Sequence, residues 1–217
     1  MLDFHSLRTL FSWLDFAWEA LIKNIVHWMA WNLFLAFIPL ALSFWLFRKS
    51  RSRSFLWWIG LLIFIAFLPN APYVLTDIIH LINEIHFYNS VWLITLVLIP
   101  EYFLFIFAGF EAYVLSLINL GYYLKRQGWG KFVLWVELLM HGLSAIGIYL
   151  GRFQRFNSWD FVTQPDALAG TVIDDALSKR PLALIAITFV VIACLYWLIK
   201  QLSLALIVYR KTMKSLP

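Results

Sequence analysis

Charged residues are scarce in this chain. They make up 13% of its 217 residues, whereas hydrophobic residues make up 63% and the mean hydropathy is +0.80. A soluble domain is about 25% charged, and one of this size could not bury twelve tryptophans and twenty phenylalanines. A soluble enzyme, a disordered chain and a nucleic-acid-binding domain are therefore excluded as first interpretations. The composition indicates a polytopic membrane protein.

Cysteines and enzyme motifs are scarce too. Cys194 is alone, which excludes an intrachain disulfide. There is no Gly-x-Ser-x-Gly, His-Glu-x-x-His, Walker or Cys-x-x-Cys motif, no channel filter signature and no internal repeat. We therefore expect no cofactor and no bound metal. Acidic residues interrupt the first 24 positions, so we expect no cleavable signal peptide.

Five apolar stretches are long enough to approach or cross a hydrocarbon core about 30 Å thick. They cover residues 25–47, 55–69, 91–119, 132–150 and 182–199. The expected fold is all-α, a single polytopic membrane bundle of about five transmembrane helices over residues 25–209. A basic tail follows at 210–217.

The basic residues predict the orientation of this bundle. They gather in alternate connections without acids and in the tail: Arg48, Lys49, Arg51 and Arg53; Lys125, Arg126 and Lys131; Arg210, Lys211 and Lys214. We expect the bundle to lie in the cell (plasma) membrane. The positive-inside rule then places the N-terminus outside the cell and the C-terminus in the cytoplasm. The same clustering identifies the net charge of +5 as an orientation signal rather than as a sign of nucleic-acid binding.

The first 24 residues predict a separate amphipathic helix. Apolar residues from Phe4 to Leu21 recur at three- and four-residue spacing, with Arg8, Asp15 and Glu19 largely opposite. We expect this helix to lie in the outer membrane interface rather than to form a sixth span.

The second span ends in an unusual polar segment. Pro69 and Pro72 disfavour a continuous helix, and a broken helix at membrane depth must be covered by protein or line a cavity. Helical spacing afterwards would place Asp77, His80 and Glu84 on one face, where they could support acid–base chemistry or bind a cation. Alternatively, the prolines only turn the chain and Asp77 pairs with His80 structurally.

Spans three and four carry the intramembrane polar residues Glu101, Glu111, Glu137 and His141. Glu137 and His141 are four residues apart and can satisfy each other. Glu101 and Glu111 are separated by about 15 Å of helix and cannot share a small site unless the helix bends. A metal site or a proton path is one interpretation, and hydrogen bonding between helices is the other.

The loop after the fourth span offers two arginines. Arg152 and Arg155 can clamp a phosphate or carboxylate, or they can pair with Asp77, Glu84 or Asp160 and hold the outer surface together. By the predicted topology they lie on the same side of the membrane as Asp77 and His80.

Two strings of residues are together distinctive: Phe67-Leu68-Pro69-Asn70-Ala71-Pro72-Tyr73 with Thr76-Asp77 and His80, and Tyr149-Leu150-Gly151-Arg152-Phe153 with Arg155-Phe156-Asn157-Ser158-Trp159-Asp160. The sequence resembles, through these strings, an uncharacterised family of bacterial and archaeal multi-pass membrane proteins, a domain of unknown function. The resemblance extends from about Trp31 to the fifth span. It implies a small integral membrane protein and brings no activity, substrate or cofactor.

The expected site is a polar cluster on the extracytoplasmic face. Its candidate binding residues are Asn70, Tyr73, Thr76, Asp77, His80, Arg152, Arg155, Asn157 and Asp160. Three functions fit: binding or transport of a small polar solute, an enzyme acting on a lipid-linked or head-group substrate, and a structural subunit. The expected partners are the lipid bilayer and a small polar or head-group ligand, and the oligomeric state is left open.

Overall fold

The computed structural model describes residues 4–50, 52–156, 163, 166, 170 and 179–214, and within these residues it contains helices and no strand. Five helical stretches are long and apolar enough to cross a membrane: Ala30–Lys49, Phe55–Phe87, Val91–Arg126, Gly130–Arg152 and Lys179–Leu206. The predicted all-α polytopic bundle is thereby confirmed.

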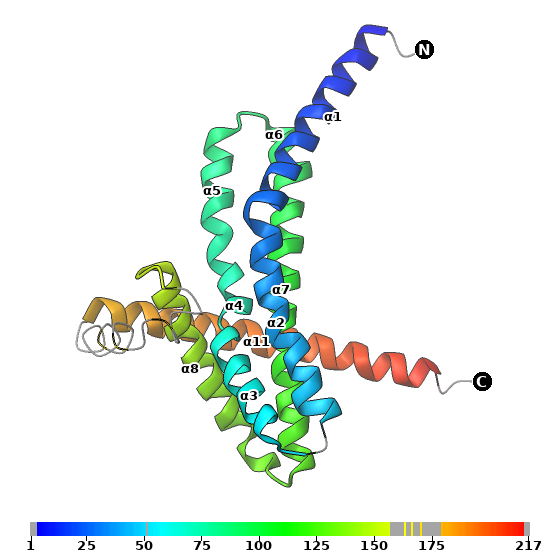
Figure 1. Cartoon of the computed structure of the whole chain (residues 1–217). Coiled ribbons are helices and arrows are strands. Elements are labelled where there is room, and N and C mark those ends of the chain that lie inside the picture. The colour runs from blue at the N-terminus through cyan, green and yellow to red at the C-terminus, as the bar shows by residue number, and fades with distance from the viewer. Residues whose placement is uncertain are drawn as a thin grey trace.

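The N-terminal half of the chain begins with one continuous helical rod (Figure 1). Helix α1 (Phe4–Asn24) runs through the wider turns of η1 (Ile25–Met29) into α2 (Ala30–Ser43) and η2 (Phe44–Lys49). The helix expected over the first 24 residues corresponds to α1, which continues into the first span without a break. No glycine or proline interrupts the chain between α1 and α2, and Asn24 keeps helical backbone angles (φ −68°, ψ −47°), so nothing ends the helix there.

The second span is distorted at its prolines but does not leave the helical region. Helix α3 (Phe55–Phe67) is followed by α4 (Asn70–Tyr73), by the 3₁₀ segment η3 (Val74–Asp77) and by α5 (Ile78–Phe87). Pro69 and Pro72 have no N–H to donate, so the carbonyl groups of Ile65 and Leu68 lose their usual helical donors. Leu68 O accepts from Ala71 N at 3.2 Å instead. Two polar side chains also bond to the backbone of this segment: Asn70 Nδ2 donates to Phe67 O (3.0 Å) and Thr76 Oγ1 to Tyr73 O (2.8 Å).

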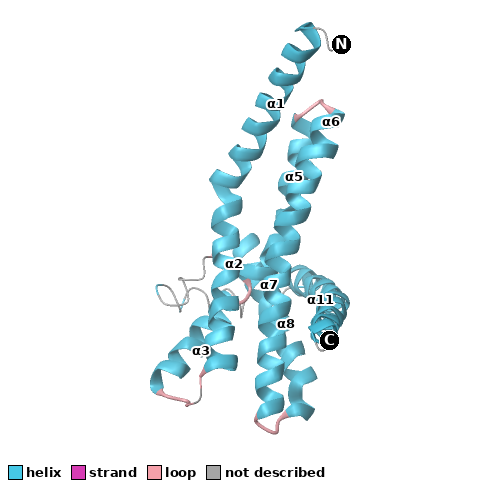
Figure 2. Ribbon diagram, turned by 90° about the vertical axis from the view of Figure 1, so that its right-hand side faces the viewer, coloured by secondary structure: helices cyan, strands magenta, loops and turns pink. Residues whose placement is uncertain are grey.

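The remaining helices build the rest of the bundle. The short α6 (Val91–Leu93) and η4 (Ile94–Leu98) lead into α7 (Ile99–Arg126), and η5 (Gly130–Phe132) leads into α8 (Val133–Arg152). Helix α11 (Lys179–Lys214) lies across α7 and α8 in Figure 1 and is seen nearly end-on in Figure 2.

Helix α7 lies at the centre and packs against α2, α4, α8 and α11. Its residues Phe110, Tyr113 and Leu117 are fully buried in the main core with Phe47 and Phe64. Glycines on α7 and α8 allow the distorted segment to pack closely against both helices. A Cβ built on Gly109 would lie 2.8 Å from Val74, and one built on Gly147 would lie 2.6 Å from Pro69. The irregular segment is thus wedged between α7 and α8.

Candidate functional site

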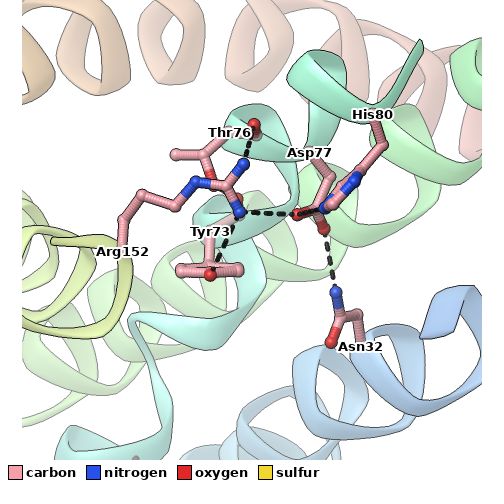
Figure 3. A network of polar contacts seen from close by, with 6 residues as sticks. All are labelled: Asn32, Tyr73, Thr76, Asp77, His80 and Arg152. Carbon is pink, nitrogen blue, oxygen red and sulfur yellow. Dashed lines mark hydrogen bonds and ion pairs between the residues drawn. The ribbon is translucent and has the colours of Figure 1, made fainter. Parts of the chain in front are cut away.

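A buried carboxylate lies where the distorted span meets two other helices (Figure 3). Asp77, at the end of η3, is 1% exposed. Its Oδ2 accepts a hydrogen bond from Asn32 Nδ2 of α2 at 2.9 Å, and its Oδ1 lies 3.5 Å from Nη1 of Arg152, the last residue of α8. Three separate parts of the chain therefore converge on one ionisable group.

Arg152 spreads its guanidinium over the distorted segment. Nη2 donates to the backbone carbonyl of Thr76 (3.2 Å), and Nη1 lies within hydrogen-bonding distance of the Tyr73 hydroxyl (3.4 Å) as well as Asp77. The side chain is 22% exposed. A planar fork that holds a carboxylate and a carbonyl at once fixes the position of α8 against η3.

His80 forms the open edge of this network. Its Nε2 lies 3.9 Å from Asp77 Oδ1, which is too far for a hydrogen bond but close enough for a charged imidazole to interact. The ring packs 4.8 Å from the Trp28 ring, and the side chain is 45% exposed. His80 is thus the member of the network best placed to exchange a proton or contact a ligand.

The structure brings together most, but not all, of the predicted site residues. Tyr73, Thr76, Asp77, His80 and Arg152 lie in one network, and we call these five with Asn32 the Asp77 network. The Asn70 side chain is turned to Phe67 O. Arg155 is exposed with a positive φ of 60° and lies outside the network, and Asn157 and Asp160 fall outside the described residues.

Asn32 was missed at the sequence level. It lies in an apolar span that carries no formal charge. Its amide group could have indicated a site residue, because amides in membrane helices commonly bond to a neighbouring helix.

Glu84 bonds to a residue outside the Asp77 network. It accepts a hydrogen bond from Asn24 Nδ2 (2.9 Å), and the same amide reaches Glu101 Oε2 at 3.4 Å. Burial raises the pKa of the nearby Tyr88 phenol, and the Glu84 and Glu101 carboxylates raise it further. Asp77 and Glu84 are seven residues apart, about 10 Å along the helix axis, so Glu84 reaches a partner on α1 instead.

Glu137 and His141 also have other partners than each other. Glu137 Oε1 lies 2.6 Å from Lys200 Nζ and accepts a hydrogen bond from the Tyr196 hydroxyl at 2.7 Å. His141 Nδ1 instead lies 2.7 Å from the hydroxyl of Tyr113 on α7. The two side chains lie on one helix, but Glu137 bonds to residues of α11 and His141 bonds to a residue of α7.

Glu111 likewise bonds to another helix, because Ser203 Oγ donates to its Oε1 at 2.8 Å. Glu101 and Glu111 thus fit the interpretation of hydrogen bonding between helices. In the part of the chain that the structure describes, no three His, Cys, Asp or Glu side chains gather as metal ligands do.

A sequence model of one protein family, described as "Protein of unknown function (DUF1361)", matches residues 31–194. The match includes every member of the Asp77 network. Searches of curated proteins and of solved structures found no match. Five apolar helices and this family match establish a multi-pass integral membrane protein of unknown activity, and the chain belongs to the DUF1361 family.

Proposed function

We propose that this protein binds, and in doing so helps to transport, a small polar solute with an anionic group at the Asp77 network. One observation carries the proposal: both basic side chains of the network are partly exposed, whereas its carboxylate is buried. His80 and Arg152 are 45% and 22% exposed, whereas Asp77 is 1% exposed. A phosphate or carboxylate approaching this site meets donors before it meets the like charge of Asp77.

Asp77 has a positioning role in this proposal. It holds the Arg152 guanidinium at 3.5 Å, and the Thr76 carbonyl holds the other nitrogen. An incoming anion competes with Asp77 for the same fork. Because Arg152 ends α8 and Asp77 ends η3, a change of partner loosens one helix against the other, as alternating access at a broken helix requires.

The predicted orientation assigns the site to the extracytoplasmic side of the cell membrane. Arg152 is at the opposite end of α8 from the basic connection around Lys125 and Lys131. The positive-inside rule assigns that connection to the cytoplasm, so the Asp77 network faces outward.

An enzyme acting on a lipid-linked or head-group substrate is the second candidate. The observation that favours it is the exposed imidazole of His80 3.9 Å from a buried carboxylate, a pairing that suits general acid–base catalysis. A purely structural role is the third, since Asp77 joins α2, η3 and α8.

A substitution of His80 can test the function of the network without removing a bond that holds the helices together. His80 lies 3.9 Å from Asp77 and makes no hydrogen bond to it. The test is complementation of a deletion strain by His80→Ala, scored for growth and for protein level in the membrane. His86→Ala is the matched control, an exposed histidine on the same helix whose ring bonds to Ile82 O.

We expect His80→Ala to accumulate like the wild type yet grow like the deletion, and His86→Ala to grow normally. Full growth of His80→Ala contradicts a binding or catalytic role for the network. Loss of growth that follows loss of protein supports the structural role instead. Uptake of labelled solutes by deletion and wild-type cells then separates transport from catalysis.

A further inference from the structure

The connections at the far end of the bundle from the Asp77 network form a second arrangement of cations. The connection between η2 and α3 and the connection between α7 and α8 both lie at the lower end of the molecule in Figures 1 and 2, and Arg53 of the first contacts Trp129 of the second. Arg48 lies near the end of η2, Arg53 lies in the connection that follows it, and Arg126 is the last residue of α7. All three guanidinium groups are placed on the adjacent aromatic residues Tyr122 and Tyr123.

Two of these arginines are held through Nε alone in the bonds that the structure shows. Arg48 Nε donates to Asn119 Oδ1 (2.7 Å), and its guanidinium carbon lies 3.9 Å from the centre of the Tyr122 ring. Arg53 Nε donates to the Tyr123 hydroxyl at 2.7 Å. A guanidinium carries five N–H donors, so anchoring through Nε fixes the plane and leaves the Nη groups for a second acceptor.

The ring of Tyr123 is shared by two guanidinium groups. The guanidinium carbon of Arg126 lies 5.7 Å from the centre of the Tyr123 ring, on which Arg53 also lies at 5.7 Å. Arg53 is in addition 5.3 Å from the ring of Trp129. Cation–π contacts at these distances favour a fixed position for each charge.

These cations have no carboxylate beside them. Neither connection contains an aspartate or glutamate between Arg48 and Arg53 or between Lys125 and Lys131. Among the described residues, the ion pairs shorter than 4.0 Å involve only Asp77 and Glu137. Orienting a helix in the membrane needs positive charge but no fixed geometry, so anchored arginines without counter-ions indicate a site for an anion from outside the chain.

We infer that this cluster, Arg48, Arg53 and Arg126 on Tyr122, Tyr123 and Trp129, binds the phosphate of an anionic phospholipid head group. A lipid is the occupant because two aromatic rings of the cluster are exposed: Tyr122 is 46% and Trp129 48% exposed. Such rings lie at the level of lipid head groups, where basic pockets between helices bind anionic lipids. The site is independent of the Asp77 network and of the function proposed for it.

The test compares phospholipids retained by the purified protein. Protein is exchanged into nanodiscs that contain phosphatidylglycerol and phosphatidylcholine, and the bound lipid is measured by native mass spectrometry. The variant Arg53→Gln with Arg126→Gln is compared with Arg155→Gln with Arg180→Gln. The control pair removes the same charge from exposed arginines that lie outside this cluster.

We expect the wild type and the control pair to retain phosphatidylglycerol selectively. The cluster variant should bind it about 25-fold more weakly, about fivefold for each arginine, because a basic residue near the membrane surface contributes about 1 kcal/mol. Equal retention by both variants, or no preference for phosphatidylglycerol by the wild type, overturns the inference.

A second measurement covers the case in which the cluster variant does not fold. The midpoint of thermal unfolding of the wild type should rise with the phosphatidylglycerol fraction and should not rise with inorganic phosphate at equal charge. Equal stabilisation by inorganic phosphate would show a site for a free anion and would contradict the lipid as occupant.

Discussion

Arg152 Nη1 lies 3.5 Å from Oδ1 of Asp77, although 75 positions separate the two residues along the chain. The contact joins the end of α8 to the 3₁₀ segment that follows the two prolines. It is also the only described ion pair of the protein in which an arginine meets a carboxylate. The distorted span and the fourth span are therefore coupled through one charge pair.

Removing either partner of this pair should destabilise the fold. Asp77→Asn keeps the shape and the contact with Asn32 but leaves Arg152 without its counter-charge. We expect a loss of about 1.5–3 kcal/mol, reduced by the partial exposure of Arg152. The measurement is thermal unfolding in detergent of Asp77→Asn, Arg152→Gln and the double variant. Strictly additive effects would contradict the pairing, since residues in contact show coupling energies.

The close approach of Gly147 to Pro69 predicts a large effect of one methyl group. Gly147→Ala would place a Cβ 2.6 Å from the proline ring, and such overpacking costs about 1–3 kcal/mol. Gly142→Ala, on the same helix, meets nothing within 4 Å and should be at least as stable as the wild type. Thermal unfolding of the two variants side by side checks this, and equal midpoints would refute the packing of α8 on the distorted segment.

The hydroxyl of Tyr196 should stabilise α11 against α8. Tyr196→Phe removes the hydrogen bond to Glu137 (2.7 Å), and a bond to a charged group contributes about 1.5–3 kcal/mol. Tyr209→Phe is the control, because this tyrosine of the same helix is 62% exposed and its change should stay within about 0.5 kcal/mol. The prediction fails if both variants unfold at the same temperature.

Cysteine labelling tests the predicted topology. Cys194 lies within the apolar span of α11, so a membrane-impermeant maleimide should not reach it in intact cells. In a Cys194→Ala background, Arg155→Cys should be labelled from outside, and Ser52→Cys only after the cells are permeabilised. Labelling of Ser52→Cys in intact cells would show the opposite orientation, with the Asp77 network on the cytoplasmic side.

The amino-acid sequence determined the class of the protein through the lengths of its apolar runs. About 20 apolar residues can satisfy their backbone groups inside a bilayer only as a helix, so five such runs specify an all-α membrane bundle. It also pointed to Tyr73, Thr76, Asp77, His80 and Arg152, because ionisable and polar groups next to a disrupted membrane helix are costly and stand out.

Only the tertiary structure decided which of these groups meet. Helical spacing placed Glu84 with Asp77 and His141 with Glu137, but Glu84 bonds to Asn24, Glu137 to Lys200 and His141 to Tyr113. Sequence distance also gave no reason to choose Arg152 over Arg155, or to include Asn32. Those choices depend on how α2 and α8 are rotated and packed against the distorted span, and packing of this kind is set by contacts between residues far apart in the chain.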